Sequence, residues 1–210
     1  QYDWWTDMVK VEGPVLELLD DLKRQGVIKY TGLGGTTVYE LAHLCRSGKF
    51  DVVLTAFNYS LLWREAGEVV FPAAVEQDMG IVIGSPLQQG ALARPADTLD
   101  DPHAYWLSAK RKKQLRDLYA FVDELDITLP ELATRWVISN PAVSCVLSGA
   151  RSAEEIEQNV ASVEKGPLDQ AVLDRLDEIA AQVPTRPAGE PWSVGWLLGA
   201  PQNYKGPGQL

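Results

Sequence analysis

Residues 51–57 read Asp-Val-Val-Leu-Thr-Ala-Phe, a short apolar run rich in β-branched side chains, and a helical stretch at 69–77 follows it. A run of this length predicts a β-strand. Similar runs occur at 27–33, 80–85 and 143–147, and each precedes residues with a helical pattern. The chain therefore alternates strand and helix through four units.

The four predicted strands are apolar on both faces, which is typical of a parallel sheet covered by helices. We therefore assign the chain to the α/β class. Repeated strand-helix units leave two architectures open: an open, doubly wound sheet, or part of a (β/α) barrel.

Capping boxes mark the starts of two helices, Thr37 with Glu40 and Ser152 with Glu155. In such a box the hydroxyl accepts from a backbone N–H of the first turn, and the carboxylate accepts from the backbone N–H of the cap residue. Helices at 14–26 and 152–163 carry apolar stripes at helical spacing: Val15, Leu18, Leu19 and Leu22 in the first, and Ile156, Val160 and Val163 in the second. Both segments are predicted to be amphipathic helices.

The domain organisation follows from these units. Residues 1–183 are expected to form one partial (β/α) barrel, and an insertion at 100–127 is expected at the carboxyl ends of the strands, where insertions commonly shape a site. Residues 184–210 are rich in Pro and Gly and contain Trp192 and Trp196. We expect an irregular but ordered tail there, because aromatic side chains are costly to leave in water.

The composition excludes several classes of function. The 210 residues carry 19 Lys+Arg and 29 Asp+Glu, a formal charge of −10, which disfavours binding to nucleic acid. A hydrophobic fraction of 46% indicates a packed core, and no apolar run approaches the roughly 20 residues of a membrane helix. The two cysteines, Cys45 and Cys145, lie in apolar segments and do not form a disulfide framework, and the first residues lack the layout of a signal peptide. These features fit a cytoplasmic protein.

Two loops that follow predicted strands are candidates for binding an anion. Residues 149–152, Gly-Ala-Arg-Ser, combine a helix N-terminus, its free N–H groups and a guanidinium, which suits a phosphate; an exposed Arg beside a capped helix is the alternative. Residues 84–90, Gly-Ser-Pro-Leu-Gln-Gln-Gly, could also meet a phosphate or ribose. Residues 32–35, Gly-Leu-Gly-Gly, match a dinucleotide fingerprint poorly, and a tight turn between strand and helix is favoured for them.

The sequence contains no motif typical of a metal site or of a catalytic nucleophile. His43 and His103 have no partner at metal-ligand spacing, so packing or surface roles are favoured and no metal site is expected. Neither a nucleophile elbow nor a Walker loop occurs.

Three motifs occur in a fixed order along the chain: residues 22–33, the Ser85-Pro86-Leu87 loop with Gln89-Gly90, and residues 149–159. Together they resemble the aldo/keto reductase superfamily, in which similar segments surround the fifth, seventh and eighth barrel strands. Residues 50–62 are most similar to the aldose 1-dehydrogenase branch. The resemblance implies a TIM (β/α)8 barrel of the aldo/keto reductase type, with only about the last four strand-helix units present in this chain.

The resemblance also implies a cofactor, NADP(H), and the residues that hold it. These are Ser85, Leu87, Gln89 and Gly90 at the pyrophosphate, Gly149, Ala150 and Arg151 at the adenosine ribose and its 2′-phosphate, and Gln158 and Asn159 at the adenine. The chain departs from the family at the nicotinamide. Gly34-Gly35 replaces a Ser-Asn pair, Ala56 replaces a Gln, and Gly84 replaces a stacking aromatic.

The family's catalytic Asp, Tyr, Lys and His belong to strands upstream of the matched region, so no catalytic residue is expected in this chain. The implied function is NADP(H)-dependent interconversion of an aldehyde, ketone or sugar hemiacetal with its alcohol or lactone. Trp106, Trp192 and Trp196 would wall the substrate pocket, with plain packing as the alternative. The other possibility is a non-catalytic nicotinamide-nucleotide-binding regulatory protein or an inactive half-barrel fragment.

A half barrel would have two open strand edges, at 28–33 and 143–147, and an unfilled apolar inner face. We therefore expect the chain to pair with a complementary half or to form a homo-oligomer.

Overall fold

The computed structural model describes residues 5–93 and 107–185. Four strands form one parallel sheet in the order β1-β2-β3-β4, so that each strand lies beside its neighbours in sequence. Their bounds are β1 Gly32–Gly35, β2 Val52–Ala56, β3 Gly80–Gly84 and β4 Cys145–Leu147. The parallel α/β sheet predicted from the sequence is confirmed.

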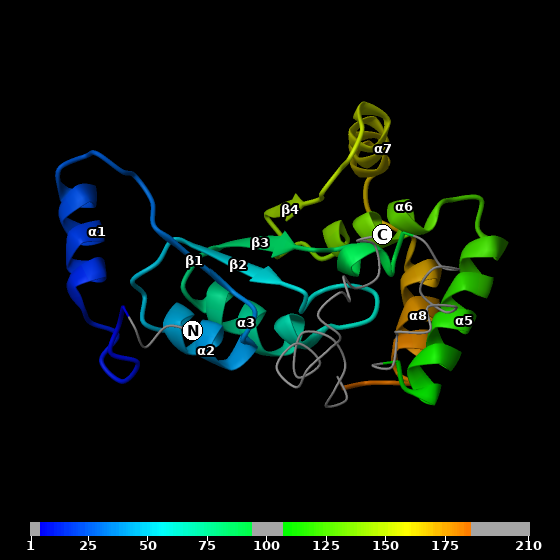
Figure 1. The fold of residues 1–210 in the computed structure, drawn as a ribbon, viewed down its shortest axis with the longest axis horizontal. Coiled ribbons are helices and arrows are strands. Elements are labelled where there is room, and N and C mark those ends of the chain that lie inside the picture. Colours follow the sequence, from blue (N-terminus) through cyan, green and yellow to red (C-terminus); the bar gives the residue numbers. More distant parts are fainter. Residues whose placement is uncertain (1–4, 94–106, 186–210) are drawn as a thin grey trace, which may run out of the picture.

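Helices connect the strands and continue after β4 (Figure 1). Their bounds are α1 Pro14–Arg24, α2 Val38–Cys45, α3 Glu65–Glu76, α5 Ala109–Glu124, α6 Leu129–Ile138, α7 Ala153–Glu164 and α8 Gln170–Ala180, with a 3-10 turn η1 at Gln88–Gly90. Ser108, Thr128 and Ser152 cap α5, α6 and α7, and each side-chain oxygen accepts from a backbone N–H of the first turn. Thr37 also occupies a cap position before α2, but its hydroxyl makes no capping bond.

One face of the sheet forms the core with the helices. Leu33, Val53 and Ile81 are buried and belong to a single apolar cluster with Leu41 of α2 and Val70 of α3. The three strand residues are paired with one another across the sheet, so their side chains lie on the same face. Helices α2 and α3 also pack against each other, so that this face is shielded from solvent.

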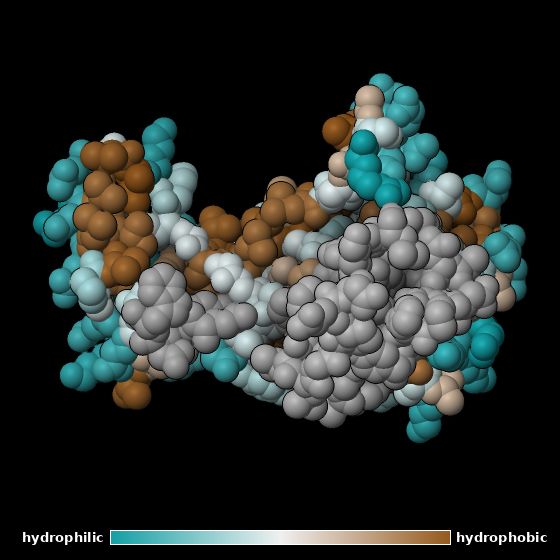
Figure 2. All heavy atoms as spheres, in the orientation of Figure 1, coloured by the Kyte–Doolittle hydropathy of each residue, from teal (hydrophilic) through white to brown (hydrophobic). Residues whose placement is uncertain are grey.

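The other face of the sheet is less protected. Gly32, Gly34 and Leu147 are exposed, and Leu54 is half-buried. Figure 2 shows apolar surface on α1 and over the sheet between α1 and α7. Within the described residues β1 pairs only with β2 and β4 only with β3, so that both edges of the sheet are open.

The first strand lies further along the chain than predicted. Val27 and Ile28 lie in the turn that follows α1, where their N–H groups donate to the carbonyl of Leu22 and Gly26 adopts a φ of +73°. Residues 32–35, predicted as a tight turn, are instead strand β1 and pair with residues 52–55. A Cβ at Gly32 would lie 3.2 Å from the carbonyl oxygen of Val52, so the missing side chain permits this close approach.

The apolar stripes of the two outermost helices are largely uncovered. In α1, Val15 and Leu18 are exposed, whereas Leu16 is the buried residue. In α7, the three stripe residues are exposed: Ile156, Val160 and Val163. The helices form as predicted, but no element of the described residues buries these exposed side chains.

The insertion contributes α5, which packs against α8. Trp106, Trp192 and Trp196, the expected pocket walls, lie outside the described residues, as does the tail from residue 186. None of the helices in the described ranges is long and apolar enough to cross a membrane.

Candidate functional site

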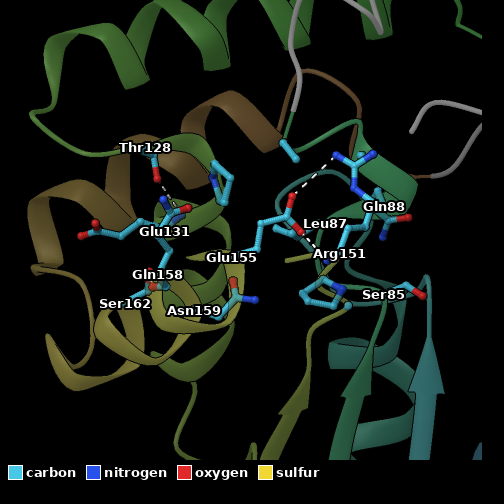
Figure 3. Close-up of a pocket in the computed structure, with 15 residues that line it drawn as sticks. Ser85, Leu87, Gln88, Thr128, Glu131, Arg151, Glu155, Gln158, Asn159 and Ser162 are labelled. Carbon is cyan, nitrogen blue, oxygen red and sulfur yellow. Dashed lines mark hydrogen bonds and ion pairs between the residues drawn. The ribbon is translucent and has the colours of Figure 1, made fainter. Parts of the chain in front are cut away.

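A cavity of about 440 Å³ lies beyond the carboxyl ends of β3 and β4. Its walls come from the loop at 85–90, the start of α6, the loop after β4 and one side of α7 (Figure 3). Ligands of α/β proteins bind at this end of the strands, because the connecting loops meet there. The cavity is therefore the leading candidate for a binding site.

The loop after β3 has an unusual backbone. Ser85 and Gln88 adopt positive φ values of 57° and 49°, and Gly90 follows at 101°. Gln88 is buried, and its side-chain amide donates to the hydroxyl of Ser60 at 2.9 Å. This bond fixes the loop against the segment that follows β2, with Ser85, Leu87 and Gly90 lining the cavity.

The loop after β4 places a cation and a helix N-terminus at the cavity. Ser152 caps α7 by accepting from the N–H of Glu155 at 3.3 Å. The backbone N–H of Arg151 donates to Glu155 Oε2 at 2.7 Å, and the Arg151 guanidinium lies 3.6 Å from Glu155 Oε1. In a standard capping box the carboxylate would reach the N–H of the cap residue itself, whereas here it binds the residue before it.

The inward side of α7 supplies polar groups. Gln158, Asn159 and Ser162 line the cavity, and Figure 3 shows them on the same helix as Glu155. The Ser162 hydroxyl donates to the carbonyl of Gln158 at 2.7 Å. The amide side chains can both donate to and accept from a ligand, as recognition of a heterocycle such as adenine requires.

The start of α6 contributes Glu131, whose side chain is 10% exposed. Lys165 donates to Glu131 Oε2 at 2.7 Å and Arg135 donates to Oε1 at 3.1 Å. Burial raises the pKa of the Glu131 carboxyl, but these two hydrogen bonds and their charges outweigh burial, so that the pKa lies below its ordinary value. Arg135 also donates to the carbonyls of Gly166 and Pro167, which ties the carboxyl-terminal end of α7 to α6.

Seven of the nine sequence-predicted site residues line this one cavity: Ser85, Leu87, Gly90, Gly149, Arg151, Gln158 and Asn159. Ala150 lies in the same loop but is not among the lining residues. The side chain of Gln89 lies outside the described part of the chain. The structure therefore brings together segments that are about 60 residues apart in the sequence, judged from positions 90 and 149.

The cavity residues that sequence reasoning did not assign include Gln88, Glu131 and, as the ion-pair partner of Arg151, Glu155. The only local signals were the spacing of Glu131 from Thr128, which starts a capped helix, and the spacing of four between Arg151 and Glu155. The partners of Gln88 and Lys165 are too distant in sequence to be deduced from spacing.

Other candidate groups lie elsewhere. His43 is exposed and contacts the carbonyl of Met8, and His103 lies outside the described residues. Burial raises the pKa of the Tyr59 hydroxyl, although Asn140 donates to its oxygen at 2.9 Å, and Tyr59 is not among the lining residues. At Gly84, a Cβ would lie 3.2 Å from the Cβ of Ala56, so a larger side chain does not fit there without displacement of its neighbour.

The aldo/keto reductase family model matches residues 1–181, and the chain belongs to this family. The chain is 28% identical over 142 residues to the D-threo-aldose 1-dehydrogenase of Pseudomonas sp, covering 67% of this chain and 43% of that protein. It is 30% identical over 158 residues to the pyridoxal 4-dehydrogenase of Microbacterium luteolum, covering 72% and 44%. It is 31% identical over 145 residues to the probable voltage-gated potassium channel subunit beta of Arabidopsis thaliana, covering 62% and 44%.

Among solved structures, the apo form of the aldo-keto reductase AKR11C1 from Bacillus halodurans matches with a TM-score of 0.67 at 26% identity. The match covers 81% of this chain and 58% of that chain. The chain spans about half the length of the curated relatives it matches. The family resemblance and the fold class predicted from the sequence are confirmed.

Proposed function

We propose that the cavity beyond β3 and β4 binds NADP(H), and that the chain is part of an NADP(H)-dependent oxidoreductase acting on an aldehyde, ketone or sugar hemiacetal. The main support for this proposal is that the loops after β3 and β4 and one side of α7, all of which the sequence analysis selected, line the same cavity of about 440 Å³. A volume of this size is within the range of small-molecule sites. The family supports the class of reaction.

The donor set fits a dinucleotide. Ser85, Leu87, Gln89 and Gly90 would meet the pyrophosphate, Gly149, Ala150 and Arg151 the adenosine ribose with its 2′-phosphate, and Gln158 and Asn159 the adenine. Arg151 lies beside the N-terminus of α7, where the helix dipole and free N–H groups also favour an anion. Both the residue chemistry and its placement support this assignment.

When bound, the cofactor supplies hydride exchange with a carbonyl carbon. The proton would be handled by a Tyr tuned by a Lys, which the family resemblance assigns to strands that precede the matched motifs. The present residues would orient the cofactor from its adenosine end. Two relatives are named for dehydrogenation of an aldose and of pyridoxal, which supports a small carbonyl compound or sugar as substrate.

The open sheet edges and the uncovered stripes of α1 and α7 support a complementary half barrel, or a second copy of the chain, as a partner. The acidic composition and the free cysteines Cys45 and Cys145 support a cytoplasmic protein that binds neither nucleic acid nor membrane.

The second candidate function is non-catalytic nucleotide binding in a regulatory subunit. It is favoured by the relative that is named a probable potassium channel subunit beta. The two candidates differ in the upstream strands: an intact Asp, Tyr, Lys and His set there supports the enzyme, and its replacement supports the regulator.

Titration of NADPH and NADH, followed by tryptophan fluorescence of the protein at its full natural length, tests the proposal. We expect NADPH to bind more tightly, and we expect Arg151→Ala to remove that preference. Arg116→Ala is the matched control, because Arg116 is exposed on α5 and does not line the cavity. Absence of nucleotide binding, or an unchanged preference in Arg151→Ala, would contradict the proposal.

A further inference from the structure

The anion-binding groups of the loop after β4 are already engaged by an anion of the same chain. Glu155 reaches back from the first turn of α7 and binds Arg151 through both the backbone N–H and the guanidinium (Figure 3). These are the donors that the proposed function assigns to a phosphate. Glu155 also lines the cavity itself, so that its charge lies where the ligand would lie.

The contact is suited to exchange rather than to permanent closure. The Arg151 side chain is 66% exposed and that of Glu155 is 41% exposed, and an ion pair in such a setting is weak because water competes for both charges. The 3.6 Å separation between Arg151 and Glu155 Oε1 is longer than a charge-assisted hydrogen bond. A phosphate with several acceptor oxygens can therefore displace the carboxylate from Arg151.

From this geometry we infer that Glu155 is a specificity-determining residue, an internal competitor for Arg151 that acts against a phosphate on the adenosine ribose. The inference rests on the proposed function. A ligand with a 2′-phosphate must displace the carboxylate and remain near its negative charge. A ligand with a free ribose diol leaves the ion pair in place and can donate its hydroxyls to Glu155, an arrangement by which carboxylates recognise the ribose of NAD in other folds.

Arg151 and Glu155 therefore act in opposite directions on the same choice. Arg151 favours the 2′-phosphate, and Glu155 reduces the advantage that Arg151 gives. The sequence that supplies the cation also supplies its competitor four residues later, so that the discrimination between NADPH and NADH is smaller than Arg151 alone would produce.

The test compares the full-length protein with its Glu155→Gln, Glu155→Ala and Glu157→Gln variants. Adenosine 2′,5′-bisphosphate and adenosine 5′-monophosphate are the probes, and affinities are measured by calorimetry. Glu157→Gln is the control, because it removes the same charge from an exposed position on α7 that does not line the cavity. Circular dichroism checks that each variant is folded.

We expect Glu155→Gln and Glu155→Ala to raise the ratio of bisphosphate to monophosphate affinity by about three- to tenfold, the range for loss of a partly exposed ion pair and one nearby like charge. Glu157→Gln should change the ratio by less than about twofold. Binding of both probes with an unchanged or lowered ratio in the two Glu155 variants would overturn the inference and leave the proposed function standing. Failure of every variant and of the wild type to bind either probe would overturn both.

Discussion

Glu131 is the residue whose replacement tests how the cavity is held together. Its carboxylate accepts from Lys165 and Arg135, and Arg135 in turn binds the chain just after α7. We expect Glu131→Gln to destabilise the protein, because the amide has one acceptor oxygen and no charge and therefore cannot keep both interactions.

The magnitude follows from the setting of the three side chains. A hydrogen bond to a charged group contributes about 1.5–3 kcal/mol, and a solvent-exposed ion pair about 0–1 kcal/mol. Arg135 is 16% exposed and Lys165 is 53% exposed, so the Arg135 bond belongs near the first range and the Lys165 bond near the second. Since glutamine retains part of one bond, we expect a loss of about 2 kcal/mol at pH 7. With a urea dependence of about 2.5 kcal/mol per molar, the unfolding midpoint falls by about 0.8 M.

The loss should depend on pH. Because the pKa of Glu131 is below its ordinary value of 4.5 in the folded protein, the stability that its charge contributes is present above pH 4.5 and is lost as pH falls through the lower, folded-state pKa. The difference between wild type and Glu131→Gln should therefore shrink as the pH falls below 4.5, as judged by urea unfolding followed by circular dichroism. Glu124→Gln, at an exposed position at the end of α5, is the control. A midpoint within about 0.2 M of the wild type at pH 7, or a difference that does not change with pH, would refute the reasoning.

Three further outcomes follow from the structure. Cys45 is fully buried, and burial raises the pKa of its thiol to about 11, whereas Cys145 is exposed. A maleimide at pH 7.5 should therefore label Cys145 in the 210-residue chain and leave Cys45 unmodified. Equal labelling of both cysteines in the folded protein would contradict the burial of Cys45 in the core. The hydrogen bond from Lys23, followed by the N–H of Thr31, lowers the pKa of Asp51, so Asp51→Asn should reduce stability at pH 7 by less than about 1 kcal/mol, and this effect should disappear below the ordinary pKa of 3.8. Light scattering of the same chain should show an assembly larger than a monomer, and a monomer with a cooperative thermal transition would count against the partner proposed for the open sheet edges.

The sequence was sufficient to predict the strands whose apolar character is continuous. The runs at 52–56 and 80–84 were located within about one residue, because a buried parallel strand needs apolar side chains on both faces. The first strand was predicted too early in the chain, because Val27 and Ile28 have side chains typical of strands. Their backbone N–H groups instead donate to the carbonyl of Leu22 in α1. A helix end of this kind depends on hydrogen bonds that side-chain preference does not reveal.

The stripes of α1 and α7 show a different limit. Their periodicity correctly predicted amphipathic helices, yet Leu18 and Val160 are exposed in the structure. A stripe specifies that a surface needs an apolar neighbour, but it does not specify whether that neighbour lies in the same stretch of chain.

The candidate site divides in the same way. Arg151 and Asn159 lie in a segment with a local pattern, so their presence at the cavity could be expected. Gln88 binds Ser60, 28 residues earlier, and Glu131 binds Lys165, 34 residues later. Contacts between residues so far apart in the sequence depend on the order of the strands in the sheet, so they cannot be predicted from spacing along the chain.

Helix α7 is attached to α6 near its carboxyl-terminal end, whereas its amino-terminal end borders the proposed phosphate site. Its twelve residues make it about 18 Å long. The hydrogen bond between Lys165 and Glu131 holds its carboxyl-terminal end, and Arg151 precedes its amino-terminal end. If the helix tilted by only about 10° about its carboxyl-terminal end, its amino-terminal end would move by about 3 Å, the length of a hydrogen bond. The ion pairs of Glu131, at the end of α7 remote from Arg151, would thereby affect how closely Arg151 approaches a bound phosphate.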